Sequence, residues 1–190
     1  YACGAIYGLP AFSDLEGHWA SESAQLCAAC GLFAGDGAGN FAPDGTLTRA
    51  QLVTVLWRLA GGPEEENGTT YGDVTSGSWY EEAVRWASGA GVAAGVGSGE
   101  GALFAPDAAM TREQFAAMLY RFCGSPETEG ESDGQTAYGD WAAVSGWADD
   151  AVAWAVEEGI LTGTPGGLLD PGGTVTRGEA GVVVQRAMET

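Results

Sequence analysis

Apolar residues recur at the three- and four-residue spacing of a helix in three separate stretches of the chain. Each stretch follows a Thr and, three positions later, a Gln or Glu, which is the pattern of a capping box. The three boxes are Thr48 with Gln51, Thr111 with Gln114, and Thr176 with Glu179. The pattern predicts three amphipathic helices, with inner faces formed by Leu52, Val55, Leu56 and Leu59; by Phe115, Met118, Leu119 and Phe122; and by Ala180, Val183, Val184 and Ala187.

A second set of helices is predicted ahead of these three. Each begins at a Trp and ends at a Gly twelve residues later, because Gly suits the left-handed end of a helix. The expected inner faces are Trp19, Leu26 and Cys27; Trp79, Val84 and Trp86; and Trp147, Val152 and Trp154. The starting tryptophans are therefore expected in the core, and the alternative is that they form platforms for a sugar ring.

The two sets of helices belong to three copies of one unit. Each copy contains, in the same order, an aromatic-x-Asp, the Trp, two Gly four residues apart, an aromatic or Leu before x-Pro, and Thr-Arg. Acidic segments rich in Gly, Ser and Pro separate the copies, and this composition predicts solvated linkers. The expected boundaries are a lead-in at 1–11, repeats at 12–62, 71–124 and 138–190, and linkers at 63–70 and 125–137.

A single helix pair of this size buries too little surface to be stable alone. Three copies are expected to pool their apolar faces in one shared helical core. The predicted fold is all-α, a compact three-pronged pseudo-trimer and not an extended solenoid.

The charge of the chain excludes several classes of partner. It has 26 acidic and seven basic residues, a formal charge of −19, and this surface repels nucleic acid and anionic membranes. No apolar run is long enough to span a bilayer. All seven basic residues are Arg, which suggests specific geometric roles for the guanidinium fork. The chain begins without Met or signal-peptide features, so we expect a piece of a larger secreted protein.

Signals for metals and cofactors are weak. Cys27-x-x-Cys30 has no second Cys pair, so a small buried side chain explains Cys27 better than zinc does. The segment Asp36–Asn40 lacks the Glu that completes a calcium loop, and His18 is expected at the surface beside Trp19. We expect no cofactor and no metal.

The arginine of each Thr-Arg pair lies at the positive end of a helix dipole, where a cation is unfavourable. Its repetition suggests a nearby anion each time, which Arg and the free N–H groups of the helix start would bind. The alternative is an internal ion pair with the aspartate of the aromatic-x-Asp. The arginines near the ends of the same helices, Arg58, Arg121 and Arg186, are expected to be structural.

In the order of Asp, Trp, Gly-rich loop, Phe-x-Pro and Thr-Arg, the chain resembles the S-layer homology (SLH) domain family in its triplet form. The resemblance runs from Phe12 to about Met188. It implies non-covalent anchoring to the cell wall of a Gram-positive-type bacterium, through anionic and often pyruvylated secondary cell-wall polysaccharide held between repeats. The residues that it implies for ligand binding are Arg49, Arg112, Arg177, Asp14, Asp73, Asp140, Trp19, Trp79, Trp147, Gly35, Gly95 and Gly163.

The third copy departs from the family pattern. Leu169 replaces the usual Phe, Gly178 follows the Arg, and the spacing from Asp140 to Trp147 is seven positions where the other copies have five and six. Binding is therefore expected chiefly at Arg49 and Arg112. The competing function is a protein–protein scaffold without a glycan ligand. An enzyme is not expected, because no repeated element supplies two carboxylates to one cleft.

Overall fold

The computed structural model of the chain describes residues 10–97, 102–127 and 137–189, and these ranges are all-α, as predicted. Extended pairing there is limited to isolated bridges. The α-helices are α1 (Ser21–Ala29), α2 (Arg49–Leu59), α3 (Glu81–Gly89), α4 (Arg112–Phe122), α6 (Asp149–Glu157) and α7 (Arg177–Glu189), with 3₁₀ turns at Ser13–Leu15 and Trp141–Ala143. No helix in the described part of the chain is both long and apolar enough to cross a membrane.

The helices that follow the Thr residues begin where the capping boxes predict. Thr48 Oγ1 accepts a hydrogen bond from the N–H of Gln51 at 3.3 Å, and the Gln51 side chain accepts one from the N–H of Thr48 at 3.1 Å. The same reciprocal pair forms at Thr111 and at Thr176. The predicted inner faces are buried or packed on the core, apart from Ala187, whose side chain lies outside the described residues.

The helices of the other set begin two residues after each Trp, so the prediction that these tryptophans lie in the core was wrong. Trp19, Trp79 and Trp147 are 64%, 60% and 56% exposed. Each lies in the turn before its helix, outside the helical period, and therefore does not share the inner face. Further along, Cys27, Val84, Trp86, Val152 and Trp154 are buried as predicted, and Leu26 is half-buried.

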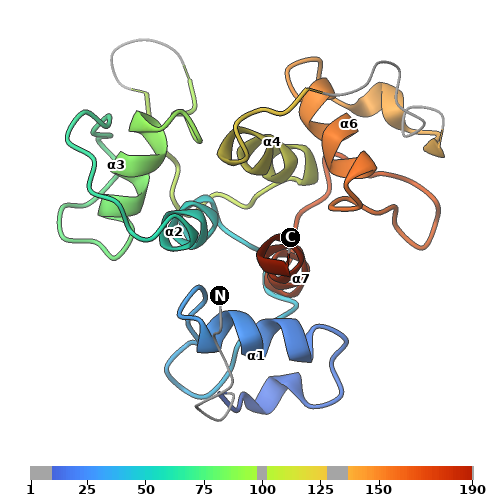
Figure 1. Ribbon diagram of the computed structural model, residues 1–190, viewed down its shortest axis with the longest axis horizontal. Helices are drawn as coiled ribbons and strands as arrows, with labels where there is room; N and C mark the ends of the chain where they lie inside the picture. The colour runs from blue at the N-terminus through green and yellow to red at the C-terminus, as the bar shows by residue number, and fades with distance from the viewer. Residues whose placement is uncertain (1–9, 98–101, 128–136, 190) are drawn as a thin grey trace.

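The helices pack between copies. The second helix of each copy packs against the first helix of the next, giving the pairs α2 with α3, α4 with α6, and α7 with α1. Figure 1 shows α2, α4 and α7 toward the middle and α1, α3 and α6 on three outer lobes. One hydrophobic cluster includes residues of all three copies, so the core is shared. Threefold pseudo-symmetry stays a prediction.

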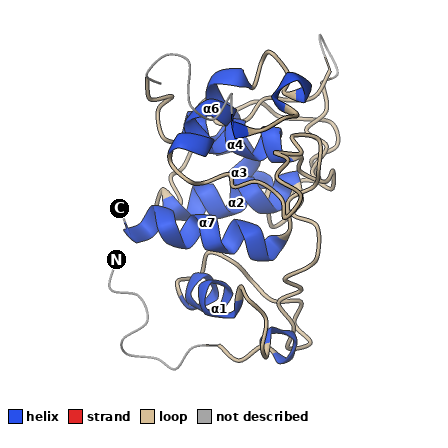
Figure 2. Ribbon diagram, turned by 90° about the vertical axis from the view of Figure 1, so that its right-hand side faces the viewer, coloured by secondary structure: helices blue, strands red, loops and turns tan. Residues whose placement is uncertain are grey.

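Three buried residues just before the helix caps connect the copies through their backbones. The N–H of Leu47 donates to the carbonyl of Val175 at 2.8 Å, Val175 donates to Met110 at 3.0 Å, and Met110 donates to Leu47 at 2.9 Å. All three side chains are at most 2% exposed. Figure 2 shows the loops gathered on one side, with the C-terminal end of α7 on the other. The closed hydrogen-bond triangle therefore lies beside the loops, at the starts of the central helices.

The first predicted linker is packed on the helices that flank it. The indole N–H of Trp57 in α2 donates to the carbonyl of Pro63, and the N–H of Thr69 donates to Ser88 Oγ of α3 at 2.8 Å. Residues 1–9 of the lead-in and 128–136 of the second linker lie outside the described residues. The predicted repeat boundaries stay predictions.

Met110→Ala is expected to lower the free energy of unfolding of the whole chain by about 2–5 kcal/mol, because it opens a cavity where the three copies meet. Chemical denaturation followed by circular dichroism measures the loss. The control is Leu103→Ala, whose side chain is 48% exposed and whose effect should stay within about 0.5 kcal/mol. Two separate transitions in wild type would contradict a shared core.

Candidate functional site

The aspartates of the three copies hold the Phe-x-Pro loops of their own copies. Asp14 accepts hydrogen bonds from the N–H groups of Phe41 at 2.9 Å and Ala42 at 2.6 Å. Asp73 binds Phe104 and Ala105 in the same way, and Asp140 binds Leu169 and Asp170, all at 2.7–2.8 Å. The middle residue of each loop has a positive φ of 52–57°, a strained conformation for a residue other than Gly. Both N–H groups of that strained turn are thus satisfied by one carboxylate.

These hydrogen bonds hold the pKa of two of the aspartates below the usual value of 3.8. For Asp140 the largest cause is the N–H of Leu169, and the charge of Arg112 adds to it. For Asp14 burial acts to raise the pKa, but the N–H groups of Phe41 and Ala42 together outweigh it.

The arginines of the Thr-Arg pairs are buried and bind carbonyls of the following copy. Arg49 donates from Nε to Phe104 at 2.9 Å and from Nη2 to Ala94 at 2.8 Å. Arg112 makes the same pair of bonds to Leu169 and Thr162, and Arg177 makes them to Phe41 and Ala34. Each of the three arginine residues is only 5–9% exposed to solvent. The arginines therefore join each copy to the next, with the third copy joined to the first.

The ion pair between these arginines and the aspartates, considered as the structural alternative, does not form among the described residues. The two groups instead bind opposite sides of one loop residue. Phe41 donates its N–H to Asp14 and accepts Arg177 at its carbonyl, and Phe104 and Leu169 do the same in their copies. The guanidinium carbon of Arg177 also lies 4.8 Å from the ring centroid of Phe41. This is a cation–π contact that Leu169 cannot offer to Arg112.

The N–H groups at the helix starts are not available to an anion, which corrects the expectation that they favour one. Arg49 N–H donates to Ala108 at 3.0 Å and Ala50 N–H to Pro106 at 3.0 Å, both in the next copy. The equivalent groups of α4 and α7 donate to the next copy in the same way. An anion at this end of the bundle therefore has to be bound by side chains.

The loop glycines are required for internal packing. A Cβ on Gly35 would lie 2.6 Å from the Phe12 ring and 2.7 Å from the carbonyl of Asn40. Gly95 and Gly163 meet Tyr71 and Tyr138 in the same way, at 2.6 and 2.5 Å. The Gly of each loop therefore accommodates the aromatic residue of its own aromatic-x-Asp.

Two of the remaining arginines, Arg58 and Arg186, and the metal candidates Cys27 and Asp36 have internal hydrogen-bond partners. Arg58 Nη1 donates to Leu32 and Arg186 Nη1 to Gly159, both at 2.9 Å, as a structural role predicts. Cys27 is buried, and burial followed by the neighbouring Cys30 raises the pKa of its thiol to about 12. Asp36 accepts hydrogen bonds from the N–H groups of Ala38 and Asn40 within its own turn.

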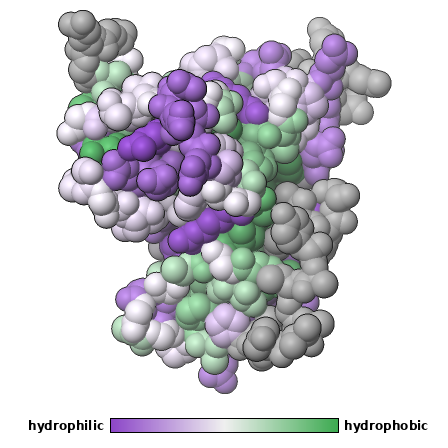
Figure 3. All heavy atoms as spheres, turned by 60° about the vertical axis from the view of Figure 1, so that its left-hand side comes forward, coloured by the Kyte–Doolittle hydropathy of each residue, from purple (hydrophilic) through white to green (hydrophobic). Residues whose placement is uncertain are grey.

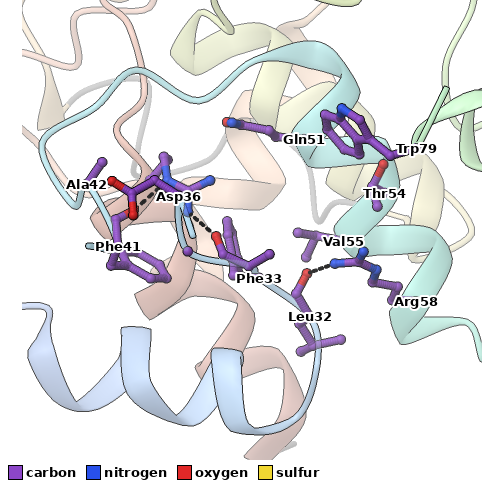
Figure 4. A pocket seen from close by; sticks show the side chains of 13 residues that line it. Leu32, Phe33, Asp36, Phe41, Ala42, Gln51, Thr54, Val55, Arg58 and Trp79 are labelled. Atoms are coloured by element: carbon purple, nitrogen blue, oxygen red, sulfur yellow. Dashed lines mark hydrogen bonds between the residues drawn. The ribbon is translucent and has the colours of Figure 1, made fainter. Parts of the chain in front are cut away.

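Two cavities lie between copies, and we call them groove 1 and groove 3 after the copy whose second helix lines them. Groove 1 has a volume of about 410 Å³ and contains residues of all three copies, including Phe33, Gly35, Gln51, Arg58, Trp79 and Arg177. Figure 4 shows Gln51 and Trp79 along one edge of groove 1, with Phe33 and Phe41 on the opposite side. Groove 3 has a volume of about 190 Å³, and its residues Leu161, Glu179, Arg186, Trp19 and Arg112 correspond to Phe33, Gln51, Arg58, Trp79 and Arg177, while Thr162 corresponds to Ala34 of groove 1.

The grooves bring together some of the predicted site residues and leave others out. Trp19, Trp79, Arg112, Arg177 and Gly35 line one or the other of the two cavities. Neither cavity is lined by the three aspartates or by Arg49, Trp147, Gly95 and Gly163. The larger cavity is served by Arg177, although the departures of the third copy predicted the weakest site there. Gln51 and Glu179, which the sequence predicts as helix caps, also line the two cavities.

Among known protein families, the model for the S-layer homology domain matches residues 11–53, 70–116 and 137–180. The chain belongs to the S-layer homology domain family. It is 31% identical to a surface-layer 125 kDa protein of Lysinibacillus sphaericus, over 94% of this chain and 15% of that protein.

Two further relatives are an enzyme and an anchoring protein. An amylopullulanase of Thermoanaerobacterium thermosulfurigenes is 30% identical over 94% of this chain and 9% of its own length. A cellulosome-anchoring protein of Acetivibrio thermocellus is 26% identical over 80% of this chain and 34% of its own length. The chain thus spans a small part of these relatives. Family and relatives support a non-catalytic cell-surface module of bacteria that is carried within larger proteins.

Arg49→Ala is expected to lower the free energy of unfolding by about 3 kcal/mol, because two buried carbonyls lose charged donors. Arg49→Lys should recover little of this, since an ammonium cannot bind both carbonyls as the planar fork does. Denaturant titration is the measurement. The control, Arg85→Ala, removes only the partly exposed pair with Glu81 and should cost less than about 1 kcal/mol. Equal, small losses for Arg49 and Arg85 would show that the inter-copy bonds contribute little.

Acid should weaken the fold through Asp14 and Asp140. Their pKa is lower in the folded chain, so the stability that they contribute is present above pH 3.8 and is lost as pH falls through the folded pKa. We expect the melting temperature of wild type to fall below about pH 4, measured by circular dichroism. The double variant Asp14→Asn, Asp140→Asn should start lower and vary less over that range. An unchanged slope would assign the acid sensitivity to other carboxylates.

Proposed function

We propose that this chain anchors a larger extracellular protein non-covalently to the bacterial cell wall by binding an anionic, pyruvylated secondary cell-wall polysaccharide between its repeats. The observation that carries the proposal is groove 1. There a buried guanidinium and an exposed indole, from two different copies, line one cavity whose volume is in the range of small-ligand sites.

The arginine of groove 1 is suited to bind a carboxylate through one nitrogen. Nε and Nη2 of Arg177 are bonded to carbonyls, which fixes the plane of the guanidinium. None of the described residues accepts a hydrogen bond from Nη1, so its two N–H groups remain for a ligand. A pyruvate ketal carries a carboxylate on a sugar ring, and a charge-assisted hydrogen bond from a preorganised donor is about twice as strong as a neutral one.

The exposed tryptophans supply apolar faces for the sugar rings. Trp79 lies at the edge of groove 1, in edge contact with Tyr80 at 5.1 Å between centroids. Trp19 borders groove 3 and lies 5.3 Å from His18, a mostly buried ring that also contacts Asp44. On the face shown in Figure 3, a hydrophobic patch lies beside a strip of hydrophilic residues in the recess between the upper and lower lobes. Because the charge of −19 repels an anionic polymer at long range, affinity has to come from such short-range contacts.

The predicted site residues divide into two roles in this proposal. Arg49, Arg112 and Arg177 bind the ligand while they join the copies, and Trp19, Trp79 and Trp147 stack on sugars. Asp14, Asp73 and Asp140, with the three loop glycines, hold the loops that form the groove walls. Anchoring of the parent protein follows from binding at several grooves along one polymer, since linked sites raise the effective concentration.

Trp79→Ala is expected to weaken sedimentation of the chain with purified peptidoglycan sacculi by at least fivefold, and to leave the melting temperature unchanged because the side chain is 60% exposed. Trp86→Ala is the matched control. That indole is 7% exposed, so its loss should destabilise the fold by about 3–5 kcal/mol.

The same assay separates the glycan from a protein scaffold. Sacculi stripped of secondary polymer by acid should no longer bind the chain. Equal binding before and after stripping would refute the glycan ligand, and self-association of the chain in their absence would favour the scaffold.

A further inference from the structure

The tryptophan of groove 1 is followed by a residue type that the other copies do not have there. Tyr80 comes directly after Trp79, and the same place in the first and third copies is filled by Ala20 and Ala148. Both alanines are fully buried, whereas Tyr80 is partly buried and packed against the hydrophobic cluster. The second copy therefore places another ring beside the exposed indole, at a position that accepts a small side chain elsewhere in the chain.

The Tyr80 ring supports the Trp79 indole in an edge-to-face contact. Their centroids lie 5.1 Å apart and their planes are at 89°, an arrangement that aromatic pairs favour. Trp79 is 60% exposed, and an exposed side chain without support exchanges between rotamers within nanoseconds. Tyr80 can hold the indole because Tyr80 is itself packed on the core. The contact therefore fixes the orientation of Trp79 at the edge of groove 1, where Figure 4 shows it.

The backbone of the same turn is held by Glu81, the first residue of α3. Glu81 Oε2 accepts a hydrogen bond from the N–H of Gly77 at 2.7 Å. The other oxygen of Glu81 accepts one from Nη2 of Arg85 at 3.2 Å, which fixes the carboxylate in turn. The bond from Gly77 to Glu81 closes the turn around Trp79. The Tyr80 contact therefore orients a side chain whose backbone is already in place.

The other two tryptophans show what the ring contact adds. The Trp19 ring lies 5.3 Å from the ring of His18. Among the described residues, Trp147 has no ring neighbour. Its turn is held by Glu113 of α4, which accepts hydrogen bonds from the N–H and Oγ of Ser145 at 3.0 and 3.1 Å. Trp147 thus combines a held backbone with an indole that no described ring supports, and it is an internal reference within the same chain.

We infer that Tyr80 is a positioning residue of groove 1, which holds the Trp79 indole in the orientation that a sugar ring of the ligand meets. This inference rests on the proposed function, in which Trp79 stacks on that sugar. Ordering a mobile side chain on binding costs conformational entropy, so an indole that is ordered beforehand raises the affinity. Tyr80 does not line the cavity, and its effect therefore passes through Trp79.

Three substitutions of Tyr80 test the inference in the full chain. Tyr80→Ala installs the residue type of the other copies, Tyr80→Leu keeps apolar packing without a ring, and Tyr80→Phe keeps the ring. The ¹⁵N relaxation of the Trp79 indole, measured without ligand, reports its order on the picosecond-to-nanosecond timescale. The order parameter should be about 0.8 in wild type and in Tyr80→Phe, and below about 0.6 in the other two variants. The Trp147 indole should stay below about 0.6 in all four chains.

Binding is measured by sedimentation with purified peptidoglycan sacculi, at a temperature well below the melting of every variant. Tyr80→Ala and Tyr80→Leu should weaken binding by about threefold, as expected for one side chain that must be ordered on binding. Tyr80→Phe should bind as wild type does. In a chain that already carries Trp79→Ala, Tyr80→Leu should cause no further loss, because a residue that acts only through the indole then has nothing to position.

The outcomes separate this inference from the proposal on which it rests. If Trp79→Ala leaves sedimentation unchanged, stacking at groove 1 is refuted, and the positioning role with it. If Trp79→Ala weakens binding, the inference alone is overturned by an indole that is equally ordered in Tyr80→Leu and in wild type. An equal loss of binding for Tyr80→Phe and Tyr80→Ala would overturn it too, as would a further loss from Tyr80→Leu in the Trp79→Ala chain. A Trp147 indole as ordered as that of Trp79 would show that no ring contact is needed.

Discussion

In each copy, one loop residue before x-Pro is bound from both sides, by an aspartate of its own copy at the N–H and by an arginine of another copy at the carbonyl. The loop conformation depends on this, because the next residue has a positive φ that its side chain disfavours. The positions of the helices depend on it too, since each arginine is the first residue of a central helix. Removing either partner would leave buried polar groups unsatisfied.

The grooves are a product of the same contacts. Burying a guanidinium is costly, and two carbonyls compensate it only partly; burial lowers the pKa of Arg177, while the nearby Asp14 carboxylate opposes that shift. A guanidinium that is held rigidly and still has unbonded N–H groups can bind an anion without a further loss of side-chain conformational freedom. Under the proposed function, structural bracing and ligand binding are two uses of one side chain, and a substitution there does not separate them. The exposed tryptophans are positions where, under the proposed function, binding can change without the fold.

Much of the fold could be predicted because its signals are local. Capping boxes, helical period and the repeated order of motifs gave the helices and their number of copies. No local signal predicts the pairing of α7 with α1. The apolar face of a helix can pack on the other helix of its own copy or on a helix of a neighbouring copy. The partners of Arg49, Arg112 and Arg177 were missed because they are backbone carbonyls, which every residue carries. The three tryptophans were expected in the core because the helices were predicted to begin at Trp, whereas the helices begin two residues later.

The cyclic exchange of contacts also bears on how such a chain can evolve. Groove 1 combines α2 and a loop of the first copy with Trp79 of the second and Arg177 of the third. A substitution at Trp79 or Arg177 therefore acts on a groove whose walls belong mainly to the first copy, so its effect depends on the sequence of that copy. Duplicated units without shared sites can diverge one at a time, whereas here a change in one copy alters the surroundings of another. Replacing one copy would alter both grooves at once.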